Sequence, residues 1–434
     1  MGAPTPWLFN KVFPLLASVI LIAVGMASST WWGPHLAGKP PWQLPDDLWG
    51  TLVAAQRLLH LDIRALYTTP TGLVALPGAA VVLVPIAALI DAAGLGLDVP
   101  SAHNAHPASW LAAGPYEIAL SATALFAADS IAERLGASRP KRMLLATGGG
   151  VALWSVSVRW GHPEDAVAVA LLMYGVLALA DSRTVRSALL VGAAVAVQPL
   201  VLLAVPVLVV MLEPRRSAGY LARAAAPGAA LLGIALAANW RATLRAVADQ
   251  PNWPTIDHPT PWITLAPHMS HGAVAAGPAR GIAVVLACGC ALIAERRWRG
   301  AQSTIEWSSV KLAEVLWWMA VALALRCVFE SVMVAYYVWP VLAMALVAAV
   351  RQWSLLIPTT ALASALTFVS QASWRGRWTW WTAVTAGLIL ALVFARGTRR
   401  ESRPHPRTVS SDAPSPLAAT LCQGSQDNRL RNTT

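Results

Sequence analysis

The sequence predicts an all-α protein, a polytopic transmembrane helical bundle of about 10–12 membrane segments. Hydrophobic residues make up 56% of its 434 positions and charged residues only 12%, a composition that excludes both a soluble domain and a disordered chain. Apolar runs of about 18 or more residues recur along most of the chain, and this is the length needed to cross a hydrocarbon core. Backbone polar groups find no water partner in lipid, so these runs must be helical.

The distribution of basic residues predicts how the chain is oriented in a plasma membrane. The net charge of +11 comes from short clusters between the apolar runs and from the tail. This positive-inside pattern favours membrane orientation over nucleic-acid binding, and we expect no nucleic-acid partner. The clusters expected in the cytoplasm lie at 139–142, 215–216, 296–299 and from Arg396 onward. The loops then expected on the outer face lie near 30–72, 161–164, 239–278 and 372–377.

Residues 1–396 are predicted to form one multi-pass transmembrane domain with outer loops 30–72 and 239–278. The first apolar run begins after Lys11 and ends near Ser29, and an uncleaved span is preferred there to a signal peptide. The further candidate spans lie near 110–134, 143–160, 164–181, 187–212, 220–238, 279–295, 312–333, 334–350, 354–371 and 378–396. Residues 397–434 are rich in Arg, Ser, Pro and Thr without apolar periodicity, which predicts a disordered cytoplasmic tail.

Two apolar segments do not fit this count as simple crossings. Segment 73–94 contains Pro77 and Pro85, which interrupt the hydrogen-bond ladder of a helix, so we expect a re-entrant or interfacial segment. Segment 187–212 has Gln198-Pro199 at its middle and basic residues at both ends. This pattern favours a hairpin of two half-helices that enters and leaves on the same side. A full crossing by either segment is the alternative.

The first outer loop contains the richest polar motif, the acidic pair Asp46-Asp47. Apolar residues follow it at helical spacing as far as His60, which predicts an amphipathic helix on the membrane surface. An acid at the start of that helix would be stabilised by the helix dipole as a cap. Two adjacent acids exceed what capping requires, so Asp46 and Asp47 are candidate catalytic carboxylates.

A second polar motif lies at the outer start of the span near 164–181. His162, Glu164 and Asp165 fall within four residues there, and they can bind a cation, orient a sugar hydroxyl or transfer a proton. Capping by the two acids after Pro163 is the structural alternative. We favour substrate binding because the run is more polar than a cap needs.

A third motif is the pair Arg326 and Glu330, four residues apart near the outer end of a span. They form either a structural ion pair or the lining of a polar cavity, with Arg326 binding a phosphate. In the long outer loop, Asp257 and His258 lie in a Pro-rich aromatic stretch. That loop either covers the substrate, which makes His258 a binding candidate, or is a solvated connector.

Several segments resemble a known family. The order is Asp47-Leu48-Trp49, Arg57-Leu58-Leu59, Leu66-Tyr67, Leu76-Pro77 and Val84-Pro85. It resembles the first outer loop of the polyprenol-phosphate-mannose-dependent mannosyltransferases of actinobacteria, which are membrane enzymes of the C-type glycosyltransferase fold. The stretch 188–212 is similar to their Gly-rich helix ending in Lys-Pro. The resemblance covers about the first half of the chain. The positions that differ from the family pattern are Ala75-Leu76-Pro77, Gly161-His162-Pro163-Glu164-Asp165 and Gln198-Pro199.

The resemblance implies a C-type glycosyltransferase bundle, a sugar donor that is a lipid phosphate, and Asp46 or Asp47 as the base. Through the matched Leu-Tyr pair it adds Tyr67 as a substrate-binding candidate. The chemistry is also consistent with the residues themselves, because transfer from a polyprenyl phosphate needs a base for the acceptor hydroxyl and positive charge near the leaving phosphate. Arg326, or a divalent cation held by the acids, would supply that charge, so a metal cofactor is left open.

The sequence therefore favours a glycosyltransferase that moves a mannose-like sugar from a polyprenyl-phosphate donor to a lipid or glycan acceptor at the outer membrane face. For this function, the acids at 46–47, the cluster at 162–165 and Arg326 must converge on one polar pocket. The alternative is a transporter of a lipid-linked or small polar solute, with a broken helix near Pro199 and buried charges at Arg326 and Glu330. A non-catalytic scaffold with the same fold is a third interpretation.

Overall fold

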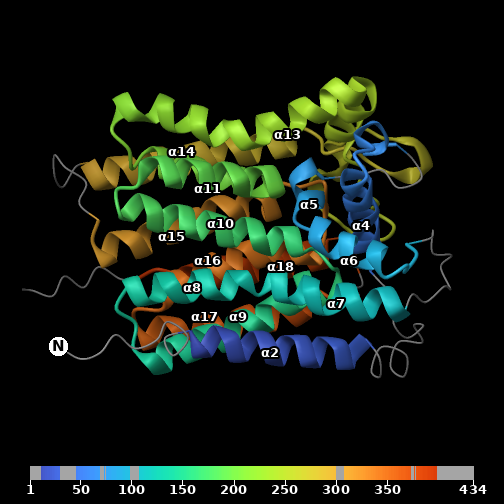
Figure 1. Cartoon of the computed structure of the whole chain (residues 1–434). Coiled ribbons are helices and arrows are strands. Elements are labelled where there is room, and N and C mark those ends of the chain that lie inside the picture. The colour runs from blue at the N-terminus through green and yellow to red at the C-terminus, as the bar shows by residue number, and fades with distance from the viewer. Residues whose placement is uncertain are drawn as a thin grey trace, which may run out of the picture. The chain divides into compact units, whose positions relative to one another are not determined.

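The computed structural model describes residues 11–29, 45–68, 73, 75–97, 107–299, 307–372, 376 and 378–397, and these are almost entirely helical (Figure 1). The all-α prediction is confirmed. Among the described residues, three helical segments are long and apolar enough to cross a membrane. They are Ala108–Arg134, which combines the two consecutive helices α7 and α8, and the single helices Pro163–Ala180 and Pro214–Asp249. Most of the other apolar helices are 10–17 residues long. The predicted tail at 397–434 lies outside the described residues except for Gly397.

The principal helices are α2 Val12–Ala27, α4 Asp46–Leu59, α5 Pro77–Val81, α6 Val84–Ala92, α7 Pro107–Ser121, α8 Thr123–Arg134, α9 Arg139–Trp154, α10 Pro163–Ala180, α11 Thr184–Val197, α12 Val205–Val209, α13 Pro214–Asp249, α14 Ala279–Arg299, α15 Ser309–Val328, α16 Trp339–Ala349, α17 Trp353–Val369 and α18 Thr379–Ala395. Short helical turns are η2 Ile63–Ala65, η3 Ser155–Arg159, η4 Pro199–Ala204, η5 Pro261–Leu265, η6 Ser270–Gly272 and η7 Ala335–Val338. Two short strands, β1 His258–Pro259 and β2 Val332–Met333, pair antiparallel.

Charged groups link several helices at one end of the bundle, which we call the basic end. Lys11, just before α2, lies 2.9 Å from Asp129 of α8. Arg142 at the start of α9 binds the same carboxylate at 2.6 Å. The neighbouring Lys141 donates to the backbone carbonyl of Arg351, which follows α16. The starts of α2 and α9 therefore lie beside the ends of α8 and α16, as expected for helices that alternate in direction.

Segment 187–212 turns back on itself. Gly192 of α11 faces Ala224 of α13, and Gly228 of α13 faces Ala196 one turn further along α11, so the two helices run parallel. The chain must therefore return between Val197 and Pro214, which it does through η4 and α12 after the break at Gln198-Pro199. The expected hairpin is present, because the proline cannot continue the helix and the glycines let α11 and α13 pack backbone to backbone.

Segment 73–94 also does not cross the bundle. It forms α5 and α6, which have 5 and 9 residues and carry Pro77 and Pro85 in their first turns. Helices of that length extend roughly 8–14 Å at about 1.5 Å per residue, far less than the roughly 30 Å of a hydrocarbon core. They pack with α4 and α7, and a side chain at Gly78 would overlap the backbone at Ala196, where α11 ends.

The amphipathic surface helix predicted after the acidic pair is α4. It buries Leu48, Leu52 and Ala55 against α5 and α6. Asp47 in its first turn and His60 just after its end are exposed. The apolar stripe read from the sequence therefore does face the rest of the molecule.

The long helix α13 contains a sharp bend. Asn239 has non-helical angles of φ −155° and ψ 81°, and its side-chain oxygen accepts from the amide of Ala242, which starts the second part of the helix. The Asn239 amide nitrogen donates to the carbonyl of Arg64 at 3.2 Å. The second part of α13 is thus fixed to the loop that follows α4.

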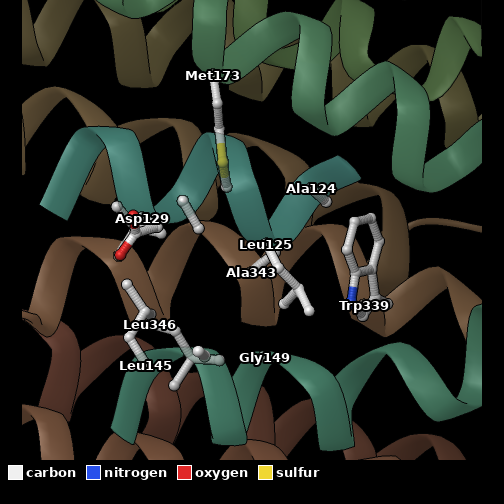
Figure 2. Close-up of a pocket in the computed structure, with 12 residues that line it drawn as sticks. Ala124, Leu125, Asp129, Leu145, Gly149, Met173, Trp339, Ala343 and Leu346 are labelled. Carbon is white, nitrogen blue, oxygen red and sulfur yellow. The ribbon is translucent and has the colours of Figure 1, made fainter. Parts of the chain in front are cut away.

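A small cavity lies inside the bundle between α8, α9, α10 and α16 (Figure 2). Its volume is about 20 Å³, which is room for roughly one water molecule. Met173, Leu125 and Trp339 line it together with the carboxylate of Asp129. It is far too small for a sugar and is part of the packed interior.

Candidate functional site

The candidate site is built around a hydrogen-bonded chain of three side chains from remote parts of the sequence. His162 Nε2 lies 2.9 Å from Asp47 Oδ2, and His162 Nδ1 lies 2.6 Å from Glu164 Oε1. A neutral imidazole has one donor and one acceptor nitrogen, so both contacts are favourable only when the ring is protonated. An imidazolium ring is therefore held between two carboxylates.

Glycine at position 161 brings these groups together. It has φ +67°, in the left-handed region that glycine adopts without strain. A Cβ at this position would lie 2.9 Å from the Leu48 Cβ and 3.0 Å from Pro45, so the start of α4 packs directly on the glycine. Pro45 is the N-cap of α4 and has no capping side chain, and Asp47 in the first turn faces His162 instead.

The electrostatics of this chain follow from its burial. The side chain of Asp47 is 53% exposed, that of His162 12% and that of Glu164 4%. Burial opposes the charged form of His162, but the charge of Glu164 and the hydrogen bonds to both acids raise its pKa well above 6.5. Burial also opposes ionisation of Asp47, yet the hydrogen bond and charge of His162 hold its pKa below the ordinary 3.8. The three hydrogen-bonded side chains thus run from a solvent-exposed end at Asp47 to a buried end at Glu164.

Aromatic side chains fix the histidine ring. Tyr336 of η7 stacks on His162 with ring centroids 4.0 Å apart and planes 27° apart. Trp160 packs on the same tyrosine at 5.8 Å, and its indole nitrogen donates to Gln371 at 2.9 Å. The orientation of His162 is thus set by packing as well as by hydrogen bonds.

Beside these aromatic side chains, two arginines share one buried carboxylate, that of Glu330. Arg326 pairs with Glu330, as the four-residue spacing predicted. Arg280, from the first turn of α14, reaches Glu330 with Nε and Nη2 at 3.2 Å each. Its Nη1 donates to Gln250 at 2.7 Å. Two guanidinium groups thus share one carboxylate, and Arg326 Nε is buried without a hydrogen-bond partner among the described residues.

Asp165 joins the acidic and basic halves of the site. Its Oδ1 accepts from the side-chain amide of Gln198, the residue at which α11 breaks. Asp165 interacts electrostatically with both His162 and Arg326. The hairpin of α11, η4 and α12 therefore delivers a polar group to the site at its tip.

The long loop between α13 and α14 is docked on the same end of the bundle. β1 pairs with β2, and Thr260 donates to the backbone carbonyl of Glu330. Asp257 interacts electrostatically with Asp47 and His162; burial and the charge of Asp47 raise its pKa to about 6, against the opposing charge of His162. These contacts favour the covering role over a solvated connector. Asp257, rather than His258, is the loop residue that faces Asp47.

Two predicted site residues, His258 and Tyr67, make their contacts away from His162. His258 stacks on Trp380 with centroids 4.0 Å apart, and burial lowers its pKa to about 4. Tyr67 is buried and its hydroxyl donates to the Ala75 carbonyl at 3.1 Å, which fixes the loop around it. Asp46 begins α4, and its side chain lies outside the described residues.

No known protein family matches the chain, and no curated protein is significantly similar to it in sequence. Its function must therefore be inferred from the site itself.

Several residues of the site were missed or undervalued from the sequence. Arg280 sits at the outer start of a predicted span, where a basic residue looks like an ordinary flank. Glu117 lies within the apolar run near 110–134, and an ionisable residue in such a run is a usable signal of function. Nothing in the sequence indicated that Tyr336 would stack on His162, because the two residues are far apart along the chain.

Among the described residues, no group of three or more His, Cys, Asp or Glu side chains is arranged to hold a metal ion.

Proposed function

We propose that the protein is a membrane glycosyltransferase of the outer face of the plasma membrane. It moves a mannose-like hexose from a polyprenyl-phosphate donor to a hydroxyl of a lipid or glycan acceptor. The observation that carries the proposal is the convergence of Asp47, the segment 162–165 and Arg326 at one end of the bundle. They provide an exposed carboxylate that can act as a base and a pair of arginines that can bind a phosphate, the two groups that such a transfer needs.

The charge distribution supports the orientation. Arg142 and Lys141 lie at the basic end, where α9 begins. Asp47 and His162 lie at the other end of α9, where α10 begins. Basic loops stay in the cytoplasm, so the site opens on the outer side. A donor on that side is lipid-linked, since nucleotide sugars are used in the cytoplasm. The C-type glycosyltransferase fold is part of the same proposal.

In the proposed reaction Asp47 acts as the general base. Its carboxylate accepts the proton of the acceptor hydroxyl while the hydroxyl oxygen attacks the anomeric carbon of the sugar. The bond from that carbon to the phosphate oxygen breaks, and its electron pair leaves with the polyprenyl phosphate. The guanidinium groups of Arg326 and Arg280, which share Glu330, stabilise the departing phosphate.

The base is tested by assaying membranes with radiolabelled polyprenyl-phosphate sugars. We compare wild type with Asp47→Asn, Asp46→Asn and the double variant at matched protein level. Because a positioned base contributes roughly 100- to 10,000-fold, Asp47→Asn should lower transfer by at least about 100-fold. Asp62→Asn is the matched control, since it removes an exposed carboxylate from the segment just after α4.

Unchanged transfer by the double variant would remove both acids from the mechanism. If no donor reacts with the wild-type protein but reconstituted vesicles accumulate a polar solute, the transporter interpretation replaces the enzyme.

A further inference from the structure

Glu117 is an acidic residue that the proposed reaction does not use. It lies in α7 with a residue exposure of 0%, and α7 packs against α10, α2 and η3. Neither of its carboxyl oxygens has a hydrogen-bond partner among the described residues. An ionised carboxylate in such surroundings would have lost its water without gaining a donor or a counter-ion, which is strongly unfavourable.

The charged groups that act on Glu117 belong to the candidate site. They are Glu164 and His162, both at the start of α10. Glu164 is itself buried, and its two oxygens differ: Oε1 accepts from His162, whereas Oε2 has no partner among the described residues. Two buried carboxyl groups thus interact while each has an oxygen that lacks a hydrogen bond.

One proton satisfies both groups. If Glu117 carries it, its O–H can donate to Glu164 Oε2, and the repulsion between two negative charges disappears. The proton belongs on Glu117 because Glu164 is already stabilised as a carboxylate by the imidazolium 2.6 Å away, whereas Glu117 has no such partner. We propose that Glu117 is a neutral carboxylic acid that donates to Glu164 and thereby positions the chain Glu164–His162–Asp47.

This donor completes the hydrogen bonding of Glu164 at the buried end of the hydrogen-bonded chain. Glu164 accepts from Glu117 on one oxygen and from His162 Nδ1 on the other. His162 then donates from Nε2 to Asp47 Oδ2 at 2.9 Å. The second oxygen of Asp47 remains for the acceptor hydroxyl. Glu117 therefore acts on the base through two other residues and is a positioning residue; this role rests on the proposed function, whereas its protonation does not.

The protonation is tested by infrared difference spectroscopy of the full-length protein, wild type against Glu117→Gln, between pH 5 and pH 8. We expect a carboxylic-acid carbonyl band that is present in the wild type across this range and missing in the variant. Absence of that band would overturn the proposal. Ser121→Ala is the control, because it alters another buried polar side chain one turn further along α7 and should retain the band.

The positioning role is tested with two substitutions of different chemistry. Glu117→Gln keeps a donor toward Glu164 and should retain transfer within about threefold, with an unchanged pH profile. Glu117→Leu keeps the volume but removes the donor, and transfer should fall at least about tenfold. The same variants are followed by nitrogen NMR of the His162 ring, which should lose its proton at a lower pH in Glu117→Leu than in wild type or Glu117→Gln.

Equal behaviour of the Leu and Gln variants in both measurements would overturn the positioning role, whether both are active or both are impaired. If the wild type transfers no sugar at all, the proposed function fails. The infrared band and the titration of His162 still decide the state and influence of Glu117 in that case.

Discussion

His162 between Asp47 and Glu164 governs how the site responds to pH at the scale of single residues. The raised pKa of His162 means that folding favours its protonated form. Its contribution to stability is therefore fully present below about pH 6.5 and is lost as the pH rises through the folded-state pKa. The lowered pKa of Asp47 has the opposite sign, so its contribution is lost only as the pH falls below about 4.

We expect the difference in thermal stability between wild type and His162→Gln to be largest near pH 6 and to shrink as the pH approaches 9. Melting temperatures in detergent at a series of pH values measure this difference. His60→Gln is the control, because this exposed histidine follows α4 and pairs with an exposed carboxylate, that of Asp91. A difference that grows with pH would contradict the assignment of the imidazolium.

At the scale of elements, glycines decide where the helices that hold the site can approach. Glycines 148–150 of α9 lie against other helices. Gly148 faces Thr360 of α17 and Gly149 faces Leu125 of α8. Gly192 brings α11 against the backbone of α13, which holds the hairpin whose tip residue binds Asp165.

Two glycine substitutions should therefore have opposite effects. In Gly192→Ala the new methyl group overlaps the Ala224 carbonyl, and the two helices must separate, at a cost of about 1–3 kcal/mol. In Gly150→Ala the nearest atom is the Ala17 Cβ at 3.8 Å, an ordinary contact, so the gain in helix propensity of about 0.5–1 kcal/mol should prevail. Melting temperatures of the two variants in one detergent provide the measurement. A lower melting temperature for Gly150→Ala than for Gly192→Ala would contradict this packing.

The sequence was informative wherever a local rule applied. Pro77 and Pro85 predicted short helices that do not cross, and Gln198-Pro199 predicted the reversal, because proline acts on its own backbone. The four-residue spacing likewise predicted the contact of Arg326 with Glu330. Arg280 could not be predicted in the same way, since it reaches Glu330 only through the packing of α14 on α15.

In the candidate site, too, the sequence indicated some of the residues but not the contacts between remote ones. That Asp47 is functional was a hypothesis from its setting, and its partner could not be identified because the two residues are 115 positions apart. Tyr67 was assigned to the site by resemblance alone, whereas its contact is with the local backbone. The role of Glu117 depends on three oxygens, two of Glu117 and one of Glu164, that lack a hydrogen-bond partner among the described residues, and these are visible only in three dimensions.

At the scale of the whole molecule, the proposal requires that the two ends of the bundle face different compartments. In a cysteine-free background, His271→Cys in the outer loop should react with a membrane-impermeant maleimide added to intact cells. Ser138→Cys at the basic end should react only after the cells are permeabilised. Both positions are exposed, so access to the reagent and not burial decides the result. Labelling of both in intact cells would contradict the orientation.

The bend at Asn239 has a consequence for how the protein would fit a bilayer. A straight helix with the 36 residues of α13 would extend about 54 Å, well beyond the roughly 30 Å of acyl chains. Up to the bend its length is about 37 Å, which matches the bilayer thickness if the helix tilts by roughly 35–40°. Its remaining turns would then lie along the headgroups beside the loop after α4. Thinner or thicker bilayers would therefore be accommodated first by a change of angle at this asparagine.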